Sequence, residues 1–157
     1  MSEAYEIVSA PALTIAGGNI TITSGTVAVS GGTVGISSQY PAGATPLSAS
    51  GTGANSVVAA TLTGVAGKIT YITGFEVTGS GAVVGLPVTV TVTGILGGTL
   101  SYTYSAIAGV LLGNGPLVVT YAIAVPASAP NVSIVVSCPQ LGLGNTNNTV
   151  VAHGYLL

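Results

Sequence analysis

A unit of seven residues repeats four times, without insertion or deletion, between residues 13 and 40. Positions one and three of the unit are aliphatic in every copy, and positions four to six hold Ala, Ser, Thr, Gly or Gln. Two aliphatic side chains spaced by two residues lie on one face of a strand, and glycine favours a turn. Each unit is therefore predicted to form a short strand and one corner of a β-solenoid coil. The four copies are LTIAGGN (13–19), ITITSGT (20–26), VAVSGGT (27–33) and VGISSQY (34–40).

Four such sides supply little more than one turn of a triangular coil, whereas several stacked turns are needed to bury a continuous core. Three identical chains would supply enough sides for about four turns, so we expect a homotrimeric stem. The alternative is a meander of small hairpins packed on the rest of the chain. The aliphatic residues predicted to form the interface of the trimeric stem are Leu13, Ile15, Ile20, Ile22, Val27, Val29, Val34 and Ile36.

The chain is nearly free of charge, with only Glu3, Glu6, Lys68 and Glu76 charged among its 157 residues. In soluble domains, about a quarter of all residues are commonly charged. We therefore expect much of the surface to be covered by copies of the chain or by other proteins. A single cation cannot neutralise several phosphates, so no nucleic-acid partner is expected.

Apolar runs are too short for a transmembrane helix, since the longest candidate, near residues 106–112, ends at Gly113-Asn-Gly-Pro. We expect no membrane partner. The N-terminus lacks the basic stretch and apolar core of a secretory signal, which indicates synthesis in a cytoplasm. Cys138 is the single cysteine, so no intrachain disulfide can form.

Four segments are predicted along the chain: an arm over residues 1–12, the repeat stem over 13–40, a Pro-, Gly- and Ser-rich linker over 41–55, and a β-sandwich over 56–157. Within the sandwich, Val88 to Thr93 alternates valine with threonine, which is typical of a half-buried strand. Seven strands separated by Gly and Pro turns favour an antiparallel, jelly-roll-like sandwich. The predicted strands cover residues 57–63, 69–77, 88–93, 100–106, 117–125, 132–138 and 149–156.

Few residues are suited to catalysis or metal binding. His153, predicted to share a strand face with Val151 and Tyr155, has neither an Asp nor a second His for a triad or a zinc site. Cys138 falls on an apolar face and is expected to behave as a small hydrophobe. Lys68 and Glu76 would share a face if their strand is continuous. We therefore expect no enzymatic activity, no cofactor and no metal.

The short arm, the unit SGTVAVSGGTV, the linker and the final segment NTVVAHGYLL resemble small virion proteins of tailed bacteriophages, namely capsid decoration (cement) or head-fibre proteins. The resemblance implies a homotrimer on the virion surface that bridges copies of the major capsid protein. The arm, with Glu3, Tyr5 and Glu6, or the repeat beside it, would then dock on the shell. The alternative is a trimeric fibre or a module that binds a host receptor or glycan through loops such as residues 113–116 or 142–148.

Overall fold

The computed structural model describes residues 40–105, 108–109 and 115–157. Every regular element in these residues is a β-strand, and all paired strands run antiparallel. The prediction of an all-β protein with antiparallel sheets is confirmed. Alternating apolar and polar residues explain this architecture, because each strand then has one apolar face that it must bury.

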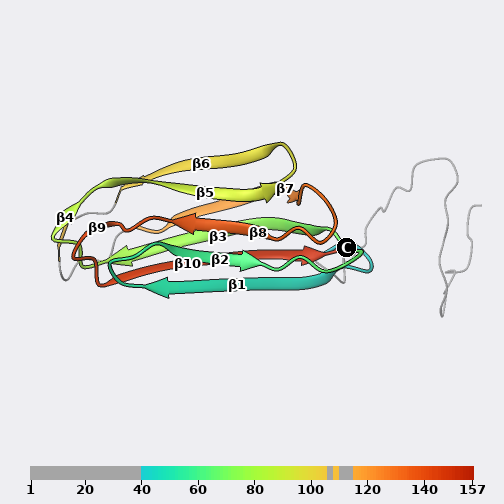
Figure 1. Ribbon diagram of the computed structural model, residues 1–157, viewed down its shortest axis with the longest axis horizontal. Coiled ribbons are helices and arrows are strands. Elements are labelled where there is room, and N and C mark those ends of the chain that lie inside the picture. Colours follow the sequence, from blue (N-terminus) through green and yellow to red (C-terminus); the bar gives the residue numbers. More distant parts are fainter. Residues whose placement is uncertain (1–39, 106–107, 110–114) are drawn as a thin grey trace, which may run out of the picture. The chain divides into compact units, whose positions relative to one another are not determined.

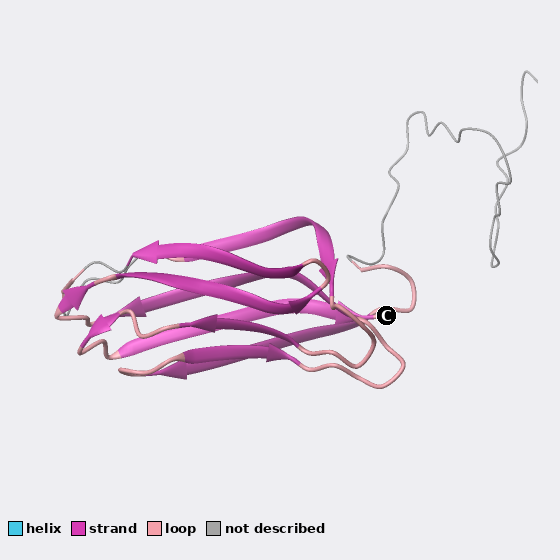
Figure 2. Ribbon diagram, turned by 45° about the horizontal axis from the view of Figure 1, so that its top comes forward, coloured by secondary structure: helices cyan, strands magenta, loops and turns pink. Residues whose placement is uncertain are grey.

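Eight long strands form two four-stranded sheets, which lie face to face around a single core (Figures 1 and 2). The two shortest strands form a separate ribbon at the end of the domain opposite the C-terminus (Figure 1). In order across each sheet, sheet A contains β1 (Thr45–Gly53), β10 (Asn147–Leu156), β3 (Thr70–Ser80) and β7 (Leu117–Pro126), sheet B contains β2 (Val58–Leu62), β8 (Ile134–Cys138), β5 (Pro87–Ile95) and β6 (Gly98–Ser105), and the ribbon contains β4 (Val84–Gly85) and β9 (Gly142–Leu143).

The long strands pair in a nested order. Without β4 and β9, the first strand pairs with the last (β1 with β10) and the second with the seventh (β2 with β8). The third pairs with the sixth (β3 with β7), and the fourth pairs with the fifth (β5 with β6). This is the pairing of one long hairpin that has been folded over into two layers, and it brings the two ends of the domain together in sheet A.

The core lies between the two sheets and contains aliphatic side chains from both. On β5, Val90 and Val92 are completely buried, whereas Thr89 is exposed on the other face, as the alternation predicts. Burial of one valine side chain stabilises the fold by about 1.5–3 kcal/mol before entropic costs. Phe75 of β3 is the largest fully buried side chain and contacts the ring of Tyr102 of β6 edge to face, 5.2 Å between centroids. This contact joins the two sheets.

The prediction of a linker over residues 41–55 is wrong for most of that segment. Residues Thr45–Gly53 form β1, and all nine pair with β10, from Thr45 opposite Leu156 to Gly53 opposite Asn148. The small residues that suggested a linker have a packing role here, because a Cβ atom at Gly51 would collide with the backbone oxygen of Ala59 in sheet B. The described residues from Tyr40 onward belong to one compact unit, which therefore includes the segment predicted as a linker.

The predicted arm and all of the predicted stem except Tyr40 lie outside the described residues and stay predictions. This applies to the candidate docking residues Glu3, Tyr5 and Glu6 and to the eight residues of the predicted stem interface, from Leu13 to Ile36. It applies equally to the trimeric winding of the repeat.

Candidate functional site

Two neighbouring β-bulges interrupt sheet A near its middle. Between β3 and β10, Thr73 is an extra residue, because Gly74 pairs with His153 while Ile72 pairs with Gly154. Between β3 and β7, Thr73 faces residues 121–124, since Ile72 pairs with Val125 and Gly74 with Thr120. A bulge bends its strand and changes the direction of nearby side chains. The edge strand β7 is therefore displaced from the regular sheet at this point.

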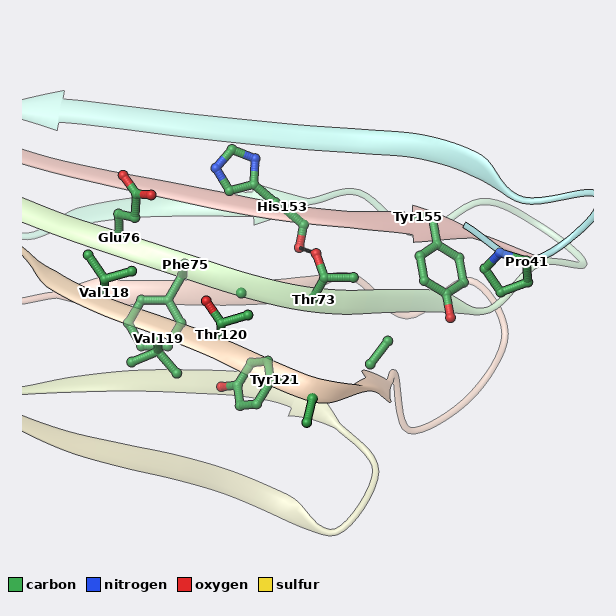
Figure 3. A pocket seen from close by; sticks show the side chains of 13 residues that line it. Pro41, Thr73, Phe75, Glu76, Val118, Val119, Thr120, Tyr121, His153 and Tyr155 are labelled. Atoms are coloured by element: carbon green, nitrogen blue, oxygen red, sulfur yellow. Dashed lines mark hydrogen bonds between the residues drawn. The ribbon is translucent and has the colours of Figure 1, made fainter. Parts of the chain in front are cut away.

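The outer face of sheet A has a hollow of about 500 Å³ at the two bulges (Figure 3). Strands β3, β7 and β10 line it, and Pro41 closes one side. Its polar lining comes from Thr73, Glu76, Thr120 and His153, and most of the remaining lining is aliphatic or aromatic. The hollow therefore combines one carboxylate, one imidazole, two threonines and two tyrosines with otherwise apolar residues.

His153 lies in β10 with its side chain exposed at the hollow (Figure 3). Tyr155 also lines the hollow, so the predicted shared face of these two residues is confirmed. Thr73 Oγ1 donates a hydrogen bond of 3.1 Å to the backbone oxygen of His153. This bond holds the bulged backbone in place and does not involve the imidazole. An exposed imidazole and a carboxylate can form hydrogen bonds with a partner surface.

Three tyrosines meet where the described chain begins. The rings of Tyr71 and Tyr155 stack with centroids 4.8 Å apart, and Tyr40 contacts Tyr155 edge to face at 5.6 Å. Such ring pairs add about 0.5–1.5 kcal/mol to the effect of area burial. Burial raises the pKa of the Tyr155 phenol, and nearby Tyr71 raises it further. The cluster fixes the entry of the chain at the outer face of sheet A.

Cys138 is fully buried and shares its face with Ile134 and Val136, as predicted. Its Sγ donates to the backbone oxygen of Pro139 at 3.3 Å. Burial raises the pKa of the thiol, although the side chain of Asn148 opposes this effect. The thiolate is the nucleophilic form of cysteine, so this environment disfavours covalent chemistry at Cys138.

Lys68 and Glu76 do not lie in one continuous strand, so the condition for their predicted common face is not met. Lys68 precedes β3 and lies in a turn, where its backbone N–H donates to the oxygen of Val65 at 3.0 Å. The extra residue Thr73 also shifts the alternation between the two positions. Glu76 stays on the outer face of sheet A and lines the hollow.

The loop over residues 142–148, predicted as a candidate receptor-binding loop, contains two buried amides. The Asn145 and Asn148 side chains are 1% and 0% exposed. Asn148 Nδ2 donates to the backbone oxygen of Pro139 at 3.0 Å. Asn55 Oδ1 accepts from Gln140 Nε2 at 2.7 Å and from the backbone N–H of Gly144 at 2.9 Å. The hydrogen bonds of Asn55 and Asn148 stabilise the end of the domain that carries β9, whereas neither side-chain polar atom of the buried Asn145 has a hydrogen-bond partner among the described residues.

The outer face of sheet B differs strongly from that of sheet A. Thr91 of β5 lies opposite Ser101 of β6 and Ser137 of β8, and Thr89 lies opposite Thr103. This face is covered mainly by small hydroxyl side chains, which water solvates well. The hollow, the tyrosine cluster and the side chains of Glu76 and His153 lie on the outer face of sheet A.

The sequence did not predict the hollow, although one signal for it is present. The buried residues of β3 are Ile72, Phe75 and Val77, and the step from Ile72 to Phe75 spans three positions rather than two. When the alternation of buried and exposed residues slips by one position inside a strand, next to a glycine, a bulge is the typical cause.

Among the described residues, no three His, Cys, Asp or Glu side chains lie close enough together to hold a metal ion. The same residues include no helix that is long and apolar enough to cross a membrane. A comparison with protein-family models, with curated proteins and with solved structures finds no match for this chain.

Proposed function

We propose that this chain is a structural protein of a virus particle, a homotrimeric decoration or cement protein that stabilises a capsid from its outer surface. The observation that carries the proposal is the nested pairing of the eight long strands in two sheets of four. First-with-last pairing across two layers favours a jelly roll, an architecture that recurs in viral capsid proteins, lectins and cupins.

Among the functions of proteins with this architecture, the low charge of the chain favours the capsid role. Of the charged residues in the sequence, only Lys68 and Glu76 lie in the described part of the chain. A surface with so little charge is suited to burial against copies and a shell. It also makes binding insensitive to salt, because screening acts on charged contacts.

The repeat over residues 13–40 supports the trimeric state, because four units of the predicted strand-and-corner type would be too few for one chain and sufficient for three. The major capsid protein is the expected partner. In this account the two-sheet domain forms the exposed knob of each subunit, and the N-terminal arm or the stem contacts the shell.

Binding to capsid shells tests the proposal. The purified full chain is mixed with shells of the virus that encodes it, prepared without this protein, and the shells are sedimented. We expect saturable co-sedimentation that resists raised salt, and shells that survive higher temperature when the chain is bound. Absence of binding would contradict the decoration role, and specific binding to glycans or host cells instead would favour the receptor-binding alternative.

A further inference from the structure

We propose that the hollow on the outer face of sheet A is a binding site for a neutral carbohydrate. The inference goes beyond the decoration role and does not depend on it. Three properties of the hollow support it: backbone that the bulge of β7 takes out of regular pairing, side chains that mix hydrogen-bond donors and acceptors with apolar surface, and walls that are already held in place.

The bulge of β7 takes four residues out of regular strand pairing. The register with β3 passes directly from Thr120 to Val125, so residues 121–124 have no partner position in β3. Among the described strands, β7 is the edge of sheet A, and no strand pairs with it on its other side. Backbone N–H and C=O groups need hydrogen-bond partners. Three of these four residues line the hollow, where their backbone groups can bond to a ligand.

The polar side chains of the hollow offer donors and acceptors close to one another. Glu76 of β3 pairs with Val151 of β10, so His153 is its diagonal neighbour on the outer face, and both side chains are exposed (Figure 3). Diagonal neighbours lie about 7–8 Å apart, which allows one small polar group to contact both side chains. The carboxylate accepts hydrogen bonds, an imidazole N–H donates them, and the hydroxyl group of Thr120 does both. A sugar matches this mixture, because each of its hydroxyl groups donates and accepts.

The apolar part of the hollow suits the C–H faces of a sugar ring. Val118 is 55% exposed, and Ala122 and Ala124 also line the hollow. Removal of water from these side chains would contribute to binding. The volume of about 500 Å³ lies within the range of about 300–1,000 Å³ that is common for ligand pockets.

Hydrogen bonds hold the walls of the hollow in place before any ligand binds. The hydroxyl group of Tyr121, the first residue of the bulge in β7, bonds to that of Tyr102 at 3.0 Å. On the opposite side, Thr73 Oγ1 holds the backbone of His153. A site on strands that are already ordered loses little conformational entropy when a ligand binds.

Other classes of ligand fit the hollow less well. A phosphate or another anion would meet the Glu76 carboxylate, and Lys68, the single Lys or Arg of the sequence, does not line the hollow. An extended peptide that adds a strand to β7 needs a continuous edge, which residues 121–124 interrupt. A compact, uncharged ligand with many hydroxyl groups is therefore favoured.

An array of neutral and sialylated oligosaccharides, probed with the full-length chain, tests the ligand class. We expect the chain to bind a subset of the neutral oligosaccharides and to bind their sialylated counterparts more weakly, because Glu76 repels a carboxylate. An array without any bound oligosaccharide would overturn the inference, and so would a preference for sialylated ones. N-acetylarginine amide is the probe for a basic side chain of a protein partner, and its binding in place of every oligosaccharide would also overturn the inference.

Two substitutions in β3 locate the site, with the oligosaccharide that binds best on the array as ligand in calorimetry. Glu76→Gln should raise the Kd by about tenfold or more, since it removes a charge-assisted hydrogen bond. Thr78→Ala is the matched control, because Thr78 is exposed two residues along β3 and does not line the hollow; it should change the Kd by less than about twofold. An unchanged Kd in Glu76→Gln, or equal effects of the two substitutions, would overturn the inference. A chain that binds shells and no oligosaccharide keeps the decoration role and loses only the carbohydrate site.

Discussion

The hydroxyl oxygens of Tyr102 and Tyr121 lie 3.0 Å apart and form a hydrogen bond between strand β6 of sheet B and strand β7 of sheet A. These strands are the edges of their sheets on the same side of the domain. Tyr102 also contacts the core ring of Phe75. This bond therefore holds the two layers together at the side that carries the β7 bulge.

Replacement of either tyrosine by phenylalanine should lower the free energy of unfolding by about 1 kcal/mol, because it removes the bond and leaves one partly buried hydroxyl without its partner. Urea denaturation of Tyr102→Phe, Tyr121→Phe and the double variant measures the effect. The double variant should lose clearly less than the sum of the two single losses. Strict additivity would show that the hydroxyls do not interact.

Alkaline pH should destabilise the fold. Burial raises the pKa of Tyr104, Tyr121, Tyr155 and the Cys138 thiol, so the folded chain binds these protons more tightly than the unfolded chain. These groups make their full contribution to the free energy of unfolding below the pKa values of the unfolded chain, which are about 8.5 for cysteine and 10 for tyrosine. It is lost as the pH rises through the higher values of the folded chain.

Urea denaturation at pH 8, 10 and 11 checks this effect. We expect the free energy of unfolding to fall steadily above about pH 9. Tyr155→Phe should fall less steeply above pH 10, because it removes one of the ionising groups. A free energy of unfolding that is constant or rises over this range would contradict the burial of these phenols.

Gly154 is the position in β10 where a side chain should be least tolerated. A Cβ atom there would collide with the backbone oxygen of Tyr71 and approach Leu62 Cδ1 to 3.1 Å. Gly154→Ala should therefore cost about 3 kcal/mol, by separating β10 from β3. Gly115→Ala is the matched control, since no atom lies within 4 Å of its added Cβ, and it should change stability by less than about 0.5 kcal/mol. Equal losses in thermal denaturation would argue against the close pairing of β10 with β3.

Cys138 should be protected in the folded chain and reactive after unfolding. Its side chain is fully buried, and its raised pKa keeps it as a thiol. We expect reaction with a thiol reagent at pH 8 to be at least about 100-fold slower in buffer than in denaturant. Free cysteine, measured under both conditions, controls for the effect of denaturant on the reagent. Rapid labelling of the folded chain would contradict the position of β8 in the core.

Alternation in the sequence is sufficient to predict the strands that bury one apolar face. The pattern of Val88 to Thr93 placed β5 correctly, including which side faces the core. It failed for β1, because Thr45 to Gly53 has mostly small side chains, with Leu47 as the one large aliphatic residue, and obtains its position from pairing with β10. Local composition cannot distinguish such an edge strand from a linker, since the cause is a contact about 100 residues away in sequence.

The candidate site was harder to predict than the strands. His153 was identified from its residue type, whereas the hollow around it depends on register shifts on both sides of Thr73. Those shifts arise when three strands are brought together, and only the spacing of Ile72 and Phe75 marks them in the sequence. The contribution of the repeat to assembly stays a prediction, because residues 13–39 lie outside the described part of the chain.

Imaging of the virus particle by electron cryomicroscopy tests the central claim most directly. The account predicts three-fold density on the outer surface of the capsid, with a volume that fits three two-sheet domains, and its loss from particles that lack this chain. Capsids that look identical with and without the chain, or density for it confined to the tail, would contradict the proposed role as a decoration protein.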